Sequence, residues 1–562
     1  MKAEVVLLYF TLSHFGRAAF PFEPSPITVV EEKYTKIYPV YVGVTERDII
    51  SIHQLLILDR SLYIGTSEHI LHIDLDKSFT DYMTDRKSAV WRSSEADEEA
   101  CKIKGRPELE CRNFIKVLLK RNDDTLFACG TNAYNPICRH YKVDTLEPEG
   151  DDIKGAGRCP YDRKDNNVAL FADDNLYSAT VRDFFRKDIL IYRSLGDKPK
   201  LRTVWADSRW LKEPSFVHAI NYGIYIYFFF QEVSVEYYGV EKIVVSRVAR
   251  VCKNDMGGNI AMLEKEWTSF LKARLVCAVP GDTPFHFNIL SSVTDVFRLG
   301  DQDIVLTTFT TPKNSIPGSA ICAFRMDDID KAFAGRFKEQ KSAVSIWTTV
   351  PDYEVPTPRP GSCAGSESFV DYASSNDLPA NVLKFLRTHV LMAESVEPIG
   401  HKPWFTMTVA TRDTMVKIAV DNTAGPNGDH TVVFIGSENG WVLKFLVQSN
   451  GNGFLERSIF LEMMNIYNYE RCRYNGDMGI KRVTDLQIDK KGGALYVAFT
   501  HCVIKVPLGS CERHGPCKKA CIASRDPYCG WANEACIHLS PGISVGYEQD
   551  VENGDTDGLD DC

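Results

Sequence analysis

The sequence predicts an all-β protein, a seven-bladed β-propeller with a mixed insertion, followed by a small disulfide-rich module. Three observations lead to this prediction. Short apolar strand signals recur along the chain and are separated by turns rich in Gly, Asn and Asp. Aromatic residues make up 11% of the chain, which favours strands. Cysteines become frequent from residue 511 onward, which indicates a separate C-terminal unit.

Seven strand groups define the predicted ring. Where the spacing between them is regular it is about fifty to eighty residues, a period typical of propeller blades, whereas a β-sandwich has no such long period. Closing the ring also removes exposed sheet edges. The segment YPVYVG at 38–43 is expected to add an N-terminal strand to the last blade. The groups are LYIGTSEHILHIDL (62–75), LFACGT (126–131), NVALFADDNLYSATV (167–181), GIYIYFFFQEVSV (223–235), DIVLTTFT (303–310), TVVFIGSENGWVLKFLV (431–447) and ALYVAFTHCVIKVPL (494–508).

One interval between strand groups is too long for a single blade. Between Val305 and Phe434 the chain must hold a regular blade and an insertion, which the Pro-rich composition places at about 311–400. An excursion of this kind is a natural place for a binding surface. Helical periodicity is confined to short segments, of which 262–275 (MLEKEWTSFLKARL) and 378–389 (LPANVLKFLRTH) are the clearest.

The N-terminal segment predicts secretion. Residues 1–19 contain one Lys, a short apolar run and small residues near their end, which is typical of a signal peptide; Glu4 argues against this, and a buried strand is the alternative. No other stretch is apolar for long enough to predict a membrane span. In an oxidising compartment most of the seventeen cysteines are expected to be paired, and the odd number leaves at least one unpaired.

Residues 511–562 form the predicted C-terminal module. It holds six cysteines and is too small to rely on an apolar core of its own. Cys529 lies beside Gly530 and Trp531, so it could be a nucleophile, and with Cys536 it could form half a zinc site. No partner His is indicated, however, and six cysteines in an oxidising module pair without metal. We therefore expect disulfides here and no metal or other cofactor.

Composition and motifs argue against two functional classes. The formal net charge of -10 gives no support to a nucleic-acid partner. HExxH, GxSxG, GxGxxG and P-loop motifs do not occur in the sequence, and no His pair has metal-ligand spacing. Ser269 and Lys272 match S-x-x-K, but the helix predicted around them favours a packing role. We therefore expect that the protein is not an enzyme.

Motifs spread along almost the whole mature chain carry a family resemblance. They are ECRNFIKVLLKRNDDTLFACGTNAYNPICRHY (110–141), RCPYDRKDNNVALFADDNLYSATVRDF (158–184), WLKEPSFVHAINYGIYIYFFF (210–230), VCKNDMGG (251–258), WTSFLKARLVCAVPGD (267–282), NSIPGSAICAF (314–324), GRFKEQKS (335–342), CVIKVPLGSCERHG (502–515) and CIASRDPYCGW (521–531). Together they resemble the ectodomain of a class 6 semaphorin. The resemblance implies a seven-bladed sema propeller over residues 20–510 and a PSI module over residues 511–562, in agreement with the strand count.

The resemblance also implies a disulfide pairing, which spacing alone leaves open. The implied pairs are Cys101–Cys111, Cys129–Cys138, Cys252–Cys363, Cys277–Cys322, Cys472–Cys502, Cys511–Cys529, Cys517–Cys562 and Cys521–Cys536. Cys252–Cys363 would close a long loop at the base of the insertion, worth about 4–5 kcal/mol in the chain-entropy model. Cys159 remains and is expected to be a buried free thiol, with an intermolecular bridge as the alternative.

The function implied by the resemblance is that of an extracellular guidance ligand, secreted or at the cell surface. It would act as a homodimer and bind plexin receptors, with class A plexins expected. Two contacts on a rigid dimer raise the effective concentration of the second binding event. The alternative is a receptor fragment, because plexins also carry sema and PSI modules, although the inserted region and the class 6 motifs favour the ligand.

The match places candidate receptor contacts in residues 201–214. They are Trp205, Ala206, Asp207, Arg209 and Lys212. An exposed Trp beside Arg is typical of an interface anchor, but Trp205 could instead lie in a blade core, as we expect for Trp210. The sequence departs from its relatives here, because a Lys-His pair is familiar at positions 205 and 206, and Arg is frequent where this chain has Gln231.

Three further residues are expected at a dimer interface by the same match. They are Ile316, Arg387 and Val409. The alternatives are that Ile316 is an ordinary apolar loop residue and that Arg387 is a solvated charge on a helix.

Overall fold

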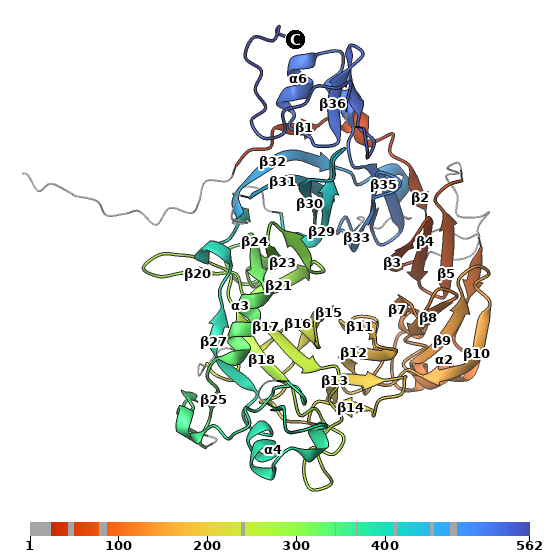
Figure 1. Ribbon diagram of the computed structural model, residues 1–562. Helices are drawn as coiled ribbons and strands as arrows, with labels where there is room; N and C mark the ends of the chain where they lie inside the picture. The colour runs from red at the N-terminus through yellow and green to blue at the C-terminus, as the bar shows by residue number, and fades with distance from the viewer. Residues whose placement is uncertain are drawn as a thin grey trace, which may run out of the picture.

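The computed structural model shows a closed ring of sheets with a small module at its rim (Figure 1). It describes residues 24–42, 50–77, 87–237, 242–342, 344–366, 369–407, 413–449, 455–472, 480–543 and 545–562. The predicted signal peptide at 1–19 lies outside these residues. The first strand of each blade contacts the first strand of the next, and the seventh blade contacts the first in the same way, which closes the ring. The predicted seven-bladed propeller is confirmed.

The propeller strands of each blade pair antiparallel and lie outward from the axis in chain order. Blade 1 contains β3 (Ile52–Leu58), β4 (Ser61–Thr66), β5 (His69–Asp74) and β6 (Ser88–Val90); blade 2 contains β7 (Ile115–Lys120), β8 (Thr125–Gly130), β9 (Ile137–Lys142) and β10 (Pro148–Lys154). Blade 3 contains β11 (Val168–Ala172), β12 (Asn175–Val181), β13 (Ile189–Ser194) and β14 (Leu201–Arg202); blade 4 contains β15 (Ser215–Tyr222), β16 (Tyr225–Val233), β17 (Val244–Cys252) and β18 (Leu271–Leu275). Blade 5 contains β21 (Ile289–Val293), β22 (Phe297–Leu299), β23 (Gln302–Thr310), β24 (Ser319–Arg325) and β28 (Phe405–Met407); blade 6 contains β29 (Met415–Ala424), β30 (His430–Ser437), β31 (Trp441–Ser449) and β32 (Leu455–Asn465); blade 7 contains β33 (Asp485–Asp489), β34 (Ala494–Ala498) and β35 (Cys502–Pro507).

Segments distant in sequence complete three of these sheets. The N-terminal strand β2 (Val40–Val42) pairs with β35 and supplies the outer strand of blade 7, as predicted for 38–43. The strand β1 (Thr28–Val30) pairs in parallel with β32, and β27 (Leu391–Val396) pairs in parallel with β18. The ring is therefore closed by strands from both ends of the propeller sequence.

The second strand of every blade accounts for the repeated signal in the sequence. Each predicted strand group contains one of these strands, β4, β8, β12, β16, β23, β30 or β34. Such a strand has a neighbouring strand on each side within its sheet and a blade against each face. Because both faces are buried, its sequence is a continuous apolar run. All residues of β12 and β34 are buried, and Tyr227 to Phe230 in β16 are 0% exposed.

The insertion leaves the ring later than the sequence predicts. The range 311–400 includes β24, yet β24 pairs with β23 and β28 inside blade 5. The excursion proper starts with α3 (Met326–Ala334), continues through the hairpin of β25 (Lys338–Glu339) and β26 (Thr348–Thr349), and ends after β27. The helix predicted in 378–389 is confirmed as α4 (Ala380–Leu386).

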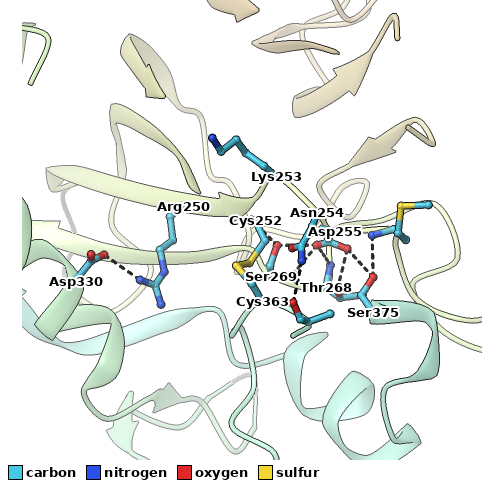
Figure 2. Close-up of a disulfide and its surroundings, with 12 residues drawn as sticks. Arg250, Cys252, Lys253, Asn254, Asp255, Thr268, Ser269, Asp330, Cys363 and Ser375 are labelled. Atoms are coloured by element: carbon cyan, nitrogen blue, oxygen red, sulfur yellow. Dashed lines mark hydrogen bonds and ion pairs between the residues drawn. A yellow bond between two sulfur atoms is a disulfide. The ribbon is translucent and has the colours of Figure 1, made fainter. Parts of the chain in front are cut away.

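A buried carboxylate ties the insertion to blade 4 (Figure 2). Asp255, only 2% exposed, accepts hydrogen bonds from the backbone N–H groups of Gly257, Thr268 and Ser269. It also accepts from the hydroxyls of Thr268, Ser269 and, within the insertion, Ser375. The disulfide Cys252–Cys363 closes a sequence separation of 111 residues beside it. The insertion is thus held both covalently and by a hub of charge-assisted hydrogen bonds.

The helix predicted for 262–275 is wrong. Its second half forms β18, and Trp267 is buried, with Nε1 donating to the Ile191 carbonyl at 2.9 Å and its ring stacked on Tyr177. These tertiary contacts override the local periodicity. The S-x-x-K pair is still structural, because Ser269 hydrogen-bonds Asp255 and Lys272 is fully buried.

The disulfides of the structure include every pair that the resemblance implies. They are Cys101–Cys111, Cys129–Cys138, Cys252–Cys363, Cys277–Cys322, Cys472–Cys502, Cys511–Cys529, Cys517–Cys562 and Cys521–Cys536. Cys159 is buried with its sulfur against Cys129, and it also lies 3.4 Å from the Gly130 carbonyl oxygen. One sulfur forms one disulfide, so Cys138 and Cys159 are alternative partners of Cys129, and the free thiol at Cys159 stays a prediction.

The C-terminal module is a small stapled unit that follows blade 7. It contains α6 (Lys518–Ala523) and a hairpin of β36 (Cys529–Ala532) and β37 (Ala535–His538). Its bridges Cys511–Cys529 and Cys521–Cys536 cluster, and Trp531 packs against them. In the described parts of the chain, no helix has the length and apolar character needed to cross a membrane.

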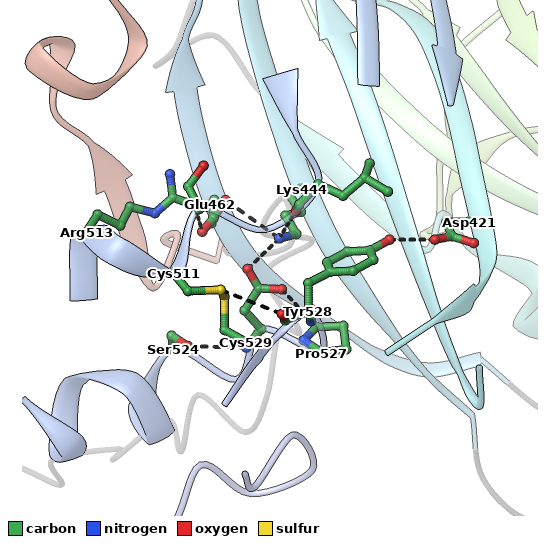
Figure 3. Close-up of polar contacts among 12 residues, drawn as sticks. Asp421, Lys444, Glu462, Cys511, Arg513, Ser524, Pro527, Tyr528 and Cys529 are labelled. Atoms are coloured by element: carbon green, nitrogen blue, oxygen red, sulfur yellow. Dashed lines mark hydrogen bonds and ion pairs between the residues drawn. A yellow bond between two sulfur atoms is a disulfide. The ribbon is translucent and has the colours of Figure 1, made fainter. Parts of the chain in front are cut away.

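Buried charges join this module to blade 6 (Figure 3). The Lys444 ammonium, 0% exposed, donates to Asp526 Oδ2 at 2.6 Å and to the Leu508 carbonyl at 2.7 Å. Glu462 lies 3.8 Å from the same ammonium and also pairs with Arg513. Tyr528 donates its hydroxyl to Asp421 Oδ2 at 2.7 Å, and burial, with Asp421 beside it, raises the pKa of Tyr528 well above its usual value. The module is therefore docked on the propeller through a buried network of ion pairs and hydrogen bonds.

Candidate functional site

The segment 201–214 presents one large apolar side chain to solvent. It leaves the outer strand β14 of blade 3 and crosses to blade 4 through two turns. Trp205 is 64% exposed, so it does not lie in a blade core. Ala206 follows in the left-handed region with φ 52°, a conformation that costs a non-glycine residue about 1–2 kcal/mol. A strained residue persists where its surroundings fix the backbone, so the position of Trp205 is defined by the fold.

Trp210 holds this segment down on the propeller. It is 1% exposed, stacks on Phe270 with ring centroids 5.0 Å apart, and donates Nε1–H to the Arg387 carbonyl at 3.1 Å. The expected core role of Trp210 is thus what the structure shows. The two tryptophans of the segment therefore differ in role: Trp210 anchors the segment on the propeller, and Trp205 is exposed to solvent.

The end of the segment is fixed by a buried ion cluster. The Lys212 N–H donates to Glu232 Oε2 at 3.1 Å, and the Val233 N–H donates to the Lys212 carbonyl at 3.0 Å. Glu232 Oε1 accepts from Arg247 Nε at 2.9 Å and from Lys272 Nζ at 2.6 Å, and all three side chains are 0% exposed. Burial lowers the pKa of Lys272, while the Glu232 carboxylate opposes that shift. Removing one member of such a cluster leaves a buried charge unpaired, so the cluster that holds the Lys212 backbone is costly to break.

Asp207 and Arg209 pair with each other at the surface. Arg209 donates from Nε to Asp207 Oδ1 at 2.9 Å and from its terminal nitrogen to Oδ2 at 2.5 Å. The carboxylate raises the pKa of the Arg209 guanidinium. Both side chains are partly accessible, so the pair can rearrange toward a charged partner at small cost. All five candidate residues thus lie in one continuous segment around Trp205.

The three candidate dimer residues are not brought together. Ile316 is 57% exposed on the loop between β23 and β24, where its carbonyl accepts from Thr311 Oγ1 at 2.7 Å. Arg387 caps the C-terminal end of α4, a helix that lies away from β23 and β24 (Figure 1), and its guanidinium lies 3.8 Å from Glu266. Val409 lies outside the described residues. Because its carbonyl receives the Trp210 side chain, Arg387 belongs with segment 201–214 rather than with Ile316.

Sequence reasoning missed the residues that position this segment. Glu232 is the most important of them, because it anchors Lys212 while neutralising Arg247 and Lys272. A signal was present, since Glu232 ends the apolar run YIYFFFQE, where a lone carboxylate in a buried strand requires a partner. Phe270 gave no comparable signal, because its stacking on Trp210 depends on the tertiary fold.

Known proteins share both domains of this chain. The Sema domain family matches residues 291–474, and the PSI family, described as Plexin repeat, matches residues 510–562. Human Semaphorin-6A is 57% identical over 570 residues, which cover 100% of this chain and 55% of that protein. The chain therefore spans about half the length of this relative.

Solved structures give the same result. The structure of Drosophila Semaphorin 1b, extracellular domains 1–2, has a TM-score of 0.78 at 33% identity and covers 92% of this chain and 96% of that chain. A solved structure of Drosophila Plexin A in complex with Semaphorin 1b matches with a TM-score of 0.76 at 33% identity, over 92% of this chain and 97% of that chain. The extracellular region of Plexin A4 is 17% identical with a TM-score of 0.60, over 89% of this chain and 50% of that one, which shows a shared fold alone. The chain belongs to the semaphorin family, and its sema propeller and PSI module are those of class 6.

Proposed function

We propose that the chain is an extracellular guidance ligand that binds a plexin receptor through the segment 201–214. The observation that carries this proposal is Trp205, a large apolar side chain that is 64% exposed in a segment anchored by the buried Trp210 and by the backbone of Lys212. Interface anchors are most often Trp, Tyr and Arg held in place before binding, because little entropy is then lost on association. The family supports the partner, since a semaphorin of the same fold has been solved in complex with a plexin.

Class A plexins are the proposed receptors, as the class 6 relationship implies. The departure at Trp205-Ala206 falls on the proposed contact itself, so it bears directly on receptor choice. The alternative of a receptor fragment is less favoured, because identity is 57% to a semaphorin and 17% to a plexin of known structure. A ligand of this kind acts by bringing receptors together and needs no catalytic group.

We further propose that the ligand is a homodimer through the propeller face that carries the loop of Ile316. The exposed apolar side chain supports this, because single large apolar residues on rigid loops are suited to the centre of a small interface. An Ile316→Asp change would place a charge there and is expected to yield monomers in sedimentation velocity. Val344→Asp, at a second exposed apolar residue in the insertion, is the matched control and should leave the mass unchanged.

The experiment that tests the proposed function is a binding panel. The soluble chain is passed over immobilised ectodomains of each plexin class while its mass is recorded by light scattering. Saturable binding confined to plexins, strongest for class A, with a dimeric mass, is the expected result. Equal binding to unrelated receptor ectodomains, or no binding to any plexin, would contradict the proposal.

A further inference from the structure

A polar cavity lies on the axis of the propeller and has no part in the proposed receptor contact. Its volume is about 1010 Å³, and all seven blades or the segments that lead into them contribute to its wall. The charged residues of the wall are Lys116, Lys313, Lys417, Arg482 and Glu438. Glu438 accepts from Arg482 at 2.9 Å, so these two neutralise each other. The three lysines remain, and the cavity wall carries net positive charge.

Two of these lysines line the cavity from different blades and have unused donors, and the charge of Lys417 acts on Lys116. Lys116 on β7 donates to the Arg163 carbonyl at 2.9 Å, which leaves two of its N–H groups. Lys417 on β29 makes no side-chain hydrogen bond or ion pair within the part of the chain that the structure describes. Asp485 interacts electrostatically with Lys417, and its oxygens accept backbone N–H groups from Leu55 at 3.0 Å and Leu486 at 2.9 Å. No described carboxylate lies within ion-pair distance of either lysine.

Burial also shifts the pKa values of two residues in the cavity wall. Burial lowers the pKa of Lys116 to about 8; Asp165 and Asp162 oppose the shift, and the charges of Lys417 and Arg163 add to it. Burial lowers the pKa of His53 to about 3, again with help from Lys116 and Arg163. Burial is the largest cause of both shifts, and the neighbouring positive charges add to it.

Three residues of the cavity wall carry a buried polar atom without a hydrogen-bond partner. His53 Nε2 is buried and has no hydrogen-bond partner, and the same holds for Gln54 Oε1 and Gln231 Oε1, all in the cavity wall. Buried polar groups are almost always hydrogen-bonded, so the polar wall of the cavity is not saturated by its own protein partners. An imidazole N–H at Nε2 would add a neutral donor to the five N–H groups left on Lys116 and Lys417.

We propose that the axial cavity binds a compact oxyanion carrying at least two negative charges, a phosphate or sulfate group, between Lys116 and Lys417. Lysine ammonium groups bind phosphate as point charges, and charge-assisted hydrogen bonds are the strong ones. The cavity volume leaves room for the group to be free or part of a small phosphorylated or sulfated molecule. Because this site lies on the axis and Trp205 at the outer end of blade 3, the proposal does not depend on receptor binding.

Calorimetry on the whole chain tests the proposal. Pyrophosphate, inorganic phosphate, sulfate and inositol hexakisphosphate are titrated at constant ionic strength near pH 7, with chloride as the reference. We expect one site per chain for at least one of these probes. Tighter binding of inositol hexakisphosphate than of inorganic phosphate would identify an organic phosphate as the natural ligand, and the reverse order would identify the free ion.

Substitutions separate this site from diffuse ion binding. Lys417→Gln and Lys116→Gln should each weaken affinity about tenfold or more, since each removes charge-assisted hydrogen bonds. Lys402→Gln, at an exposed lysine outside the cavity, is the matched control and should change nothing. Lys417 makes no side-chain bonds to described residues, so its variant is expected to fold, and its melting temperature in chloride verifies this. No binding to any probe, or equal loss in Lys417→Gln and Lys402→Gln, would overturn the proposal.

Discussion

Replacing Lys444 by Met should loosen the C-terminal module from the propeller. The ammonium of Lys444 is fully buried between Asp526 and Glu462 and also binds the Leu508 carbonyl. Methionine is also unbranched but one atom shorter, and it supplies no charge or donor. Two carboxylates would then share the site with Arg513 alone, which pairs with Glu462. Breaking a buried pair in this way costs about 3–5 kcal/mol.

Native-state hydrogen exchange is the assay for this change, because it measures local opening without requiring the whole chain to unfold as one unit. A cost of about 3–5 kcal/mol corresponds to exchange faster by about one hundred to a few thousand times, at one factor of ten per 1.4 kcal/mol. The acceleration should appear in β36 and β37 and in the facing strand β31, while β12 in blade 3 stays protected.

A surface variant provides the control. Lys518 pairs with Glu548 at 2.6 Å on the outside of the module, where both side chains are partly exposed. Lys518→Met should therefore change local stability by less than about 1 kcal/mol. If Lys444→Met exchanged like wild type or like Lys518→Met, the buried network would not be what docks the module.

Two further predictions concern titration and the insertion. The pKa of His53 falls from 6.5 to about 3 on folding, so between these pH values the unfolded chain binds one more proton than the folded chain. The free energy of unfolding therefore falls as the pH drops below 6.5, by about 1.4 kcal/mol per pH unit. Urea unfolding of His53→Gln should show a smaller loss of stability from pH 6.5 to 4, and equal losses in His53→Gln and wild type would contradict this. Asp255→Asn keeps the shape of the side chain but removes the negative charge, and the Asp255 carboxylate accepts six hydrogen bonds. The change should therefore lower the free energy of unfolding by about 2–3 kcal/mol and speed proteolysis within residues 363–375. Asp371→Asn, at an exposed carboxylate of the insertion, should have neither effect.

The fold was predictable because one strand in each blade is buried on all sides. That burial imposes a continuous apolar run, and the run repeats with the blade, so seven groups can be counted along the sequence. The boundaries of the insertion were less predictable, because the composition of β24 does not reveal whether this strand pairs within blade 5 or belongs to the insertion. Periodicity misled at 262–275, where Trp267 and its neighbours face a core formed by other blades.

The candidate site was predictable only in part. Trp205 near Arg209 can be recognised in the sequence. The exposure of Trp205 depends on how Trp210 anchors the segment, and Trp210 donates to the carbonyl of Arg387, 177 positions away. The pairing of Arg387 with this segment and its separation from Ile316 follow from the path of the insertion across blade 4. Contacts of this range leave no local pattern.

The affinity of Trp205→Ala for a class A plexin ectodomain tests the central claim most directly. Surface plasmon resonance would compare it with wild type and with Tyr353→Ala, an aromatic residue that is 86% exposed on the insertion. Loss of a buried aromatic anchor costs at least about 2 kcal/mol, so we predict a Kd weaker by about thirtyfold or more, with Tyr353→Ala unchanged. An unchanged Kd for Trp205→Ala in a folded protein would show that the receptor binds elsewhere.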